Sequence, residues 1–147
     1  MDTQPQQVTD STKLQELESF LELNNLPFTD LTLEGNVFWK YCDPQGNMVG
    51  SGGLEMYGDV ALLRSVAVRQ AERSKNLGSK IVNKLLQHAK ESGIKSVFLL
   101  TETAHDFFLK KGFTDLSRDE VPIALKTSSE FSFVCPASAK CMVYHLS

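Results

Sequence analysis

The spacing of apolar residues predicts a helix near the start of the chain. Apolar side chains recur three or four residues apart from Leu14 to Leu21, which places them on one helical face. Asp10 or Ser11 can cap the open amides of the first turn, and the polar stretch 24–27 ends the helix. The first nine residues are polar and predict a loose arm or one short edge strand.

A second amphipathic helix gives the clearest pattern in the sequence. Apolar residues recur at four-residue intervals from Leu77 to Ala89, and Ser92-Gly93 supplies the stop. This helix therefore turns one apolar face toward a core.

Runs of β-favouring residues predict a three-strand meander between the two helices. Residues 36–42 and 48–57 flank a turn sequence at 43–47, which indicates a hairpin. Residues 60–68 are nearly all apolar, as in a strand buried on both faces. The glycines of the second strand weaken it, so they indicate a bulge or the close approach of another group.

The rest of the chain alternates short strands and short helices. The expected elements are a strand at 96–101, a helix at 104–111, a strand at 113–117, a helix at 121–128 and a strand at 141–146. This order predicts an α+β sandwich, with helices on a mixed sheet, as one domain over residues 10–147.

Composition narrows the function classes. The 147 residues carry a formal net charge of -3, without the basic excess of a general nucleic-acid binder. No apolar stretch is long enough to span a bilayer and no leader pattern is present, so we expect a cytoplasmic protein without a membrane partner. Cys42, Cys135 and Cys141 form no CxxC pair, which favours reduced thiols.

The segment 62–87 carries the strongest chemical signal. An apolar strand ending at Val68 runs through a polar loop into the helix that starts near Leu77. Such a junction aims unpaired amides and the positive end of a helix dipole at one point, which favours an anion such as a diphosphate. The alternative to an anion site is an ordinary strand–helix connection with a solvated run of charges.

The same segment resembles the GCN5-related N-acetyltransferases (GNAT family). Their signature after the fourth strand is Arg/Gln-x-x-Gly-x-Gly/Ala; here Val66-Ala67-Val68 precedes it, Arg73 and Gly78 match it, and Asn76 replaces the first glycine. Asn tolerates a left-handed backbone better than most residues, so the turn can be kept.

A second family segment stands at the right distance downstream. Residues 101–113 resemble Asn-x-x-Ala-x-x-hydrophobic-Tyr-x-x-x-Gly-Phe, with Thr101 at the Asn position and Phe108 at the Tyr position. The family's usual proton donor to the departing thiolate is that Tyr. The runs GGLE, LLRSVAV, LLTETAHDFF and EFSFVCPASAKCM further resemble the bacterial arsenic-resistance-associated GNAT subgroup.

The resemblance implies a mixed, mostly antiparallel GNAT sheet, acetyl-CoA as donor and no metal. The acceptor would be the primary amine of a small molecule such as an amino acid or an arsenical amino-acid analogue. Backbone groups at Val66 and Val68 would pair with the pantetheine, an amide near Val66 would polarise the acetyl carbonyl, and loop amides would hold the pyrophosphate. The implied coenzyme-binding residues are Val66, Ala67, Val68, Arg73, Ser74, Lys75, Asn76, Leu77, Gly78, Ser79, Thr101 and Phe108.

The acceptor side depends on individual residues. Glu55, beside glycines that can open space for the acceptor, is the leading candidate for the general base; its alternative is a solvated strand-end carboxylate. Arg64 lies in an apolar run and needs an anion, either an internal carboxylate or the carboxylate of the substrate. Arg118 either binds substrate, pairs with its acidic neighbours or is solvated, and the segment from Arg118 to Ala139 is expected to cover the acceptor site.

Other side chains leave alternatives open. Tyr57 is a candidate proton relay in place of Phe108, as are Tyr144 and His145, although each is more often a packing or surface residue. No Cys or Ser stands in a nucleophile–base arrangement, so we expect direct attack of the amine.

Two non-enzymatic interpretations compete with catalysis. The first is a non-catalytic acyl-CoA-binding regulatory module, and the second is a metalloid-binding protein that uses the three thiols. Nothing in their spacing brings the thiols together, and His88 and His105 receive no role. The sequence is compatible with a homodimer.

Overall fold

The computed structural model describes residues 4–26, 28, 31–69, 76–126 and 139–146. In chain order the elements are β1 (Gln4–Gln7), α1 (Ser11–Leu23), β2 (Asn36–Cys42), β3 (Met48–Tyr57), β4 (Val60–Val68), α2 (Leu77–Glu91), β5 (Ser96–Thr101), α3 (His105–Lys110), β6 (Thr114–Asp115), the 3₁₀ turn η2 (Arg118–Glu120), α4 (Ile123–Lys126) and β7 (Lys140–His145). No helix in these ranges is long and apolar enough to cross a membrane.

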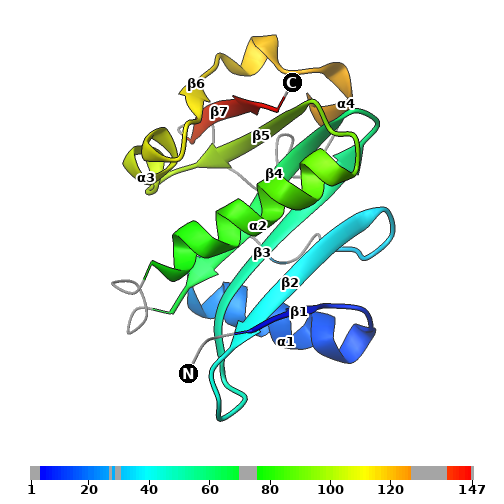
Figure 1. Cartoon of the computed structure of the whole chain (residues 1–147), viewed down its shortest axis with the longest axis vertical. Helices are drawn as coiled ribbons and strands as arrows, with labels where there is room; N and C mark the ends of the chain where they lie inside the picture. The colour runs from blue at the N-terminus through cyan, green and yellow to red at the C-terminus, as the bar shows by residue number, and fades with distance from the viewer. Residues whose placement is uncertain (1–3, 27, 29–30, 70–75, 127–138, 147) are drawn as a thin grey trace.

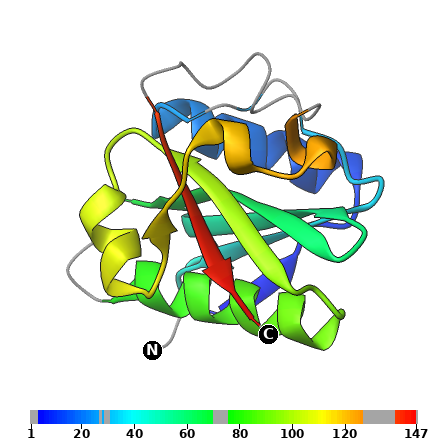
Figure 2. The same cartoon turned by 90° about the horizontal axis from the view of Figure 1, so that it is seen from above.

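The strands form one seven-stranded sheet in the order β1-β2-β3-β4-β5-β7-β6. Strands β4 and β5 run parallel, and the other neighbouring pairs are antiparallel. Helix α2 lies on one face of the sheet, and α1 and α4 lie on the other (Figures 1 and 2). The mixed, mostly antiparallel sheet flanked by helices confirms the predicted fold class.

Local sequence signals explain most element boundaries. Asp10 caps α1 by accepting the Lys13 amide at 2.8 Å, and the Asp43 side chain accepts amides of the β2–β3 turn from Gln45 and Asn47. Residues 4–7 form the edge strand rather than a loose arm, pairing with β2.

Some boundaries near the C-terminus differ from the prediction. The helix expected at 121–128 is described only as the short α4, which starts at Ile123, just after Pro122, and the 3₁₀ turn η2 precedes it; residues 127–128 lie outside the described part of the chain. The strand expected at 113–117 is only two residues long. Both segments are too short for a periodic pattern to fix their ends.

The glycines of β3 make room for neighbouring side chains. A Cβ on Gly52 would come within 2.7 Å of Ile81 on α2, and one on Gly53 would overlap the Phe38 ring. The register between β3 and β4 also shifts between Ser51 and Gly53. The predicted bulge and close approach are both confirmed, but the expectation that these glycines open space for an acceptor is wrong, because α2 and Phe38 fill that space.

Candidate active site

The site begins where β4 and β5 separate. Their parallel pairing runs from Val60 opposite Ser96 to Leu62 opposite Phe98 and then stops, while β4 continues to Val68 and β5 to Thr101. Strand β5 stays paired with β7 on its other side over its full length. The second half of β4 therefore has a backbone edge that β5 does not occupy.

A cavity of about 430 Å³ lies at this separation. Residues 63–66 of β4 and 99–101 of β5 line it, together with residues 24–26 after α1, residues 102–104, Phe108 and Ala139. Its lining mixes apolar strand residues with amides, hydroxyls and a carboxylate, as in pockets that orient a small polar ligand. Four of the predicted site residues, Arg64, Val66, Thr101 and Phe108, line this cavity.

Strand β4 carries a bulge at the cavity wall. Gly53 pairs with Arg64 and Ser51 pairs with Ala67, so Ser65 and Val66 lie opposite the single residue Gly52. Ser65 has a φ of 61°, which is uncommon for a residue other than glycine. The bulge takes Ser65 and Val66, which both line the cavity, out of the regular ladder.

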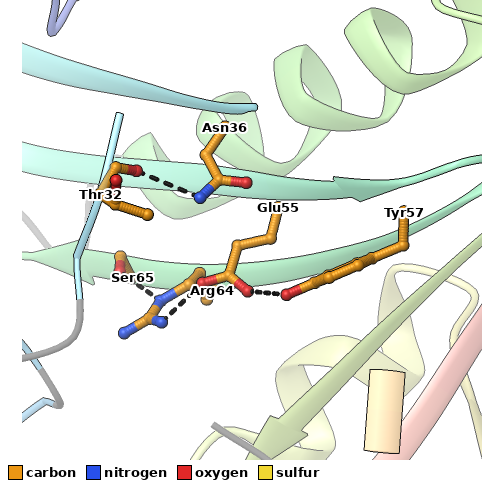
Figure 3. Close-up of polar contacts among 6 residues, drawn as sticks. All are labelled: Thr32, Asn36, Glu55, Tyr57, Arg64 and Ser65. Atoms are coloured by element: carbon orange, nitrogen blue, oxygen red, sulfur yellow. Dashed lines mark hydrogen bonds and ion pairs between the residues drawn. The ribbon is translucent and has the colours of Figure 1, made fainter. Parts of the chain in front are cut away.

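A buried polar network lies behind the bulge (Figure 3). Arg64 donates from Nη1 to Glu55 Oε2 at 2.8 Å and from Nε to Ser65 Oγ at 3.2 Å, and Tyr57 donates its hydroxyl to Glu55 Oε1 at 2.5 Å. The Arg64 and Glu55 side chains are 0% and 7% exposed. Charge-assisted bonds of this kind satisfy a charge pair taken out of water.

The network decides between the alternatives that the sequence leaves open for Arg64 and Glu55. Arg64 has an internal carboxylate partner, Glu55. The solvated alternative for Glu55 is wrong, because β3 is an interior strand and the carboxylate lies against β4 rather than at an open strand end. Sequence reasoning missed Ser51 and Ser65; two hydroxyls inside otherwise apolar or glycine-rich buried strands were the available signal.

The start of α2 preserves a tight backbone turn. Asn76, which precedes the helix, has φ 61° and ψ 17°, the left-handed conformation that suits Asn at a glycine position. Arg73, Ser74 and Lys75 fall outside the described residues. Across from this turn, Lys111 at the end of α3 donates to Ser79 Oγ at 2.8 Å and to Asn83 Oδ1 at 2.5 Å.

Gly78, one of the expected coenzyme-binding residues, lies beside two apolar side chains of the fold. A Cβ there would point at Phe107 and Val68 at 3.5–3.6 Å, which is ordinary contact inside the fold. An alanine would therefore fit, in agreement with the Gly/Ala choice of the family signature at this position.

The cavity lining includes one aromatic side chain, Phe108. Phe108 packs edge-on against Phe107 and Phe113 at ring distances of 5.1 and 5.4 Å. Thr101 Oγ1 accepts the Ala104 amide at 3.0 Å and so fixes the start of α3. Tyr144 packs against Phe113, and neither it nor His145 is among the residues that line the cavity.

Arg118 does not line the cavity but bonds to a residue that does. Its Nη2 donates to the Ala139 carbonyl at 3.4 Å, and Ala139 lines the cavity. Residues 127–138 of the predicted covering segment lie outside the described part of the chain, so that segment stays a prediction.

The described cysteines do not form a cluster. Cys42 is on β2 and Cys141 on β7, with three strands between them, which corresponds to about 19 Å at the usual strand spacing. Burial raises the pKa of the Cys141 thiol to about 11 and also raises the pKa of Cys42. These two thiols cannot share one metalloid; Cys135 lies outside the described residues.

Comparison with known proteins identifies the family of this chain. The model of the Acetyltransferase (GNAT) family matches residues 6–113. The chain belongs to this family. An amino-acid acetyltransferase from Mycobacterium tuberculosis is 35% identical over 102 residues, which are 67% of this chain and 55% of that protein. One from Photobacterium profundum is 35% identical over 72 residues, 49% of this chain and 16% of that protein. The chain thus spans about half the length of the first GNAT relative and less of the second.

Solved structures place the fold within the same family. The Rv2747 protein from Mycobacterium tuberculosis in complex with CoA and NLQ has a TM-score of 0.77 at 24% identity, covering 98% of this chain and 99% of that one. N-acetylglutamate synthase from Neisseria gonorrhoeae, complexed with coenzyme A and N-acetyl-glutamate, has a TM-score of 0.78 at 18% identity, covering 100% of this chain and 36% of that one. At these identities the likeness shows a GNAT fold.

Proposed function

We propose that this GNAT protein transfers acetyl from acetyl-CoA to the primary amine of an amino acid or an arsenical amino-acid analogue. The observation that carries the proposal is the separation of β4 from β5, with a cavity and a bulged backbone at the point where they part. The names of the relatives support an amino-acid acceptor, and the arsenical acceptor depends on the sequence resemblance alone.

The donor would bind by strand addition. The pantetheine arm carries amides and can pair with the backbone at Val66, Ala67 and Val68, on the edge of β4 that β5 leaves. Its pyrophosphate would lie over the first turn of α2, where unpaired amides and the helix dipole favour an anion. The residues proposed for that end are Arg73, Ser74, Lys75, Asn76, Leu77, Gly78 and Ser79, and Thr101 and Phe108 would flank the thioester end.

The chemistry needs no acyl-enzyme. The neutral amine attacks the thioester carbonyl, a C–N bond forms, the C–S bond breaks, and coenzyme A leaves as the thiolate. A backbone N–H near Val66 would stabilise the oxyanion. The amine loses one proton and the thiolate gains one, so the reaction balances without a further reagent.

We propose Glu55 and Tyr57 as the catalytic pair that moves the proton. Phe108 has no hydroxyl, whereas Tyr57 already shares a short hydrogen bond with Glu55. Both residues lie on β3, one strand from the bulge. A hydroxyl and a carboxylate in series can pass a proton in either direction.

We propose that the acceptor carboxylate binds at Arg118, with Arg64 as a second cation. Arg118 reaches the cavity edge through Ala139. Arg64 would have to turn from Glu55 to contact the substrate, because its side chain is fully buried in that pair. Arg118→Leu should therefore raise the KM for an amino acid more than it lowers kcat.

The test measures thiol release from acetyl-CoA over a panel of amino acids, their amides and an arsenical analogue. Amino acids should turn over and their carboxylate-blocked amides should react at least about tenfold more slowly, since the Arg118 contact is lost. Saturable coenzyme binding without turnover on any amine would instead support the regulatory module, and no binding of coenzyme A would overturn both readings.

A further inference from the structure

We propose that Ser51 is a positioning residue that holds the β4 bulge in its active shape. The inference rests on the proposed function for its kinetic consequence. Its structural half concerns how Ser65 is kept in a conformation that serine rarely adopts.

Two polar contacts meet at Ser65, one on its carbonyl and one on its hydroxyl. Ser51 Oγ donates to the Ser65 carbonyl at 2.7 Å, and Arg64 Nε donates to Ser65 Oγ at 3.2 Å. Ser51 is fully buried and Ser65 nearly so, hence no water replaces either contact at low cost. Both the main chain and the side chain of Ser65 are thus fixed.

These contacts oppose a backbone preference. A non-glycine residue with φ near +61° is unfavourable unless its surroundings enforce it. Without Ser51, Ser65 is expected to relax toward extended φ and the bulge to flatten against β3. Flattening would turn the next backbone unit, at Val66, away from the cavity that it lines.

The chain of contacts extends from Ser65 to Tyr57. Arg64 is itself held by Glu55, which accepts from Tyr57. Ser51 reaches Ser65 independently of that chain, so its role can be tested without breaking the ion pair. Its hydroxyl bonds to Ser65, to which no substrate or coenzyme contact is assigned, and its backbone pairs with Ala67 in the ladder, so Ser51 acts through other residues as a positioning residue.

The experiment compares Ser51→Ala, Ser65→Gly and the double variant. Ser51→Ala should lower kcat about tenfold with the KM for acetyl-CoA within about threefold, because a misplaced donor stabilises the oxyanion less. Glycine adopts positive φ without support. The double variant should therefore recover kcat to within about threefold of Ser65→Gly alone.

Ser96→Ala is the matched control. Ser96 lies on β5, away from the cavity lining, and its hydroxyl is hydrogen-bonded at 2.9 Å to Nδ1 of His145 on β7. The kcat of this variant should equal that of the unchanged protein. Equal losses in Ser51→Ala and in the double variant would overturn the inference, since Ser51 would then act by another route.

A second readout does not need turnover. The ¹³C chemical shifts of Ser65 report its φ in the free protein, and they should move to extended values in Ser51→Ala. Unchanged chemical shifts of Ser65 in Ser51→Ala would refute the positioning role, even if the protein acetylates no amine. Changed shifts of Ser65 in a protein that acetylates no amine would refute only the proposed function.

Discussion

The Glu55–Arg64 pair provides the sharpest test of the buried network. We consider Glu55→Leu, Arg64→Met and the two together. Each single change leaves one charge in a site where the partner side chains are 7% and 0% exposed. The double change replaces both charges by apolar groups of similar size.

The magnitudes follow from burial and geometry. Removing one partner of a buried pair at 2.8 Å should cost about 3–5 kcal/mol, a large share of the roughly 5–15 kcal/mol that stabilises a domain. Apolar replacement of both partners is often close to neutral. The double variant should therefore be more stable than either single variant by about 2 kcal/mol or more.

Urea unfolding followed by Trp39 fluorescence measures these energies. Trp39 is the single tryptophan and is buried on β2. In parallel, thiol release should show that the double variant regains stability but not turnover, because it lacks both the Glu55 carboxylate and the Arg64 contact to Ser65. Additive destabilisation would refute the charge argument, and full recovery of kcat would refute a role for this pair in the reaction.

Three further changes test separate parts of the structure. Gly53→Ala should lower the free energy of unfolding in urea by about 1–3 kcal/mol, because the added methyl overlaps the Phe38 ring. Adding Phe38→Leu should partly restore stability, and an unchanged stability of Gly53→Ala alone would contradict this packing. Asn76→Gly should keep its affinity for coenzyme A in calorimetry. Asn76→Ala should lose about 1 kcal/mol of stability, because Asn76 is in a left-handed turn. Equal melting temperatures of the two variants would contradict this prediction. Burial raises the pKa of Cys141 from 9.0 to about 11, so folding favours the protonated thiol, and the stability that this gives is present below pH 9 and lost as the pH rises toward 11. Cys141→Ala should therefore flatten the alkaline loss of stability in urea midpoints measured at several pH values. An unchanged slope would contradict this prediction.

The parts of the fold that sequence predicts are those fixed by local interactions. The spacing of Leu77, Ile81, Leu85 and Ala89 already determines which face of α2 is buried, and Asp43 already marks the hairpin turn. Sheet order could not be predicted, since it depends on pairings between residues far apart in the chain.

In the candidate site too, features set by neighbouring residues can be predicted and contacts between distant strands cannot. The turn at Asn76 and the wall residue Val66 follow from a contiguous motif. The partner of Arg64 stayed open because Glu55 is on another strand, and either a carboxylate of the protein or one from a ligand satisfies the same burial argument. The β3 glycines indicated open space, but the structure shows that the side chains of Ile81 and Phe38 fill it.

The topology itself explains why these features meet in one place. Helix α2 connects β4 to β5, so the crossover makes that pair parallel and sets the start of α2 beside the end of β4. Strand β5 keeps its other edge with β7, and it parts from β4 after Leu62. An open strand edge and a cavity therefore coincide at the carboxyl ends of the parallel strands, the position where α/β sheets bind ligands, and α2 follows β4 along the chain. An insertion that re-paired β4 with β5 beyond Leu62 would close the strand edge and the cavity together while leaving the two helical layers intact.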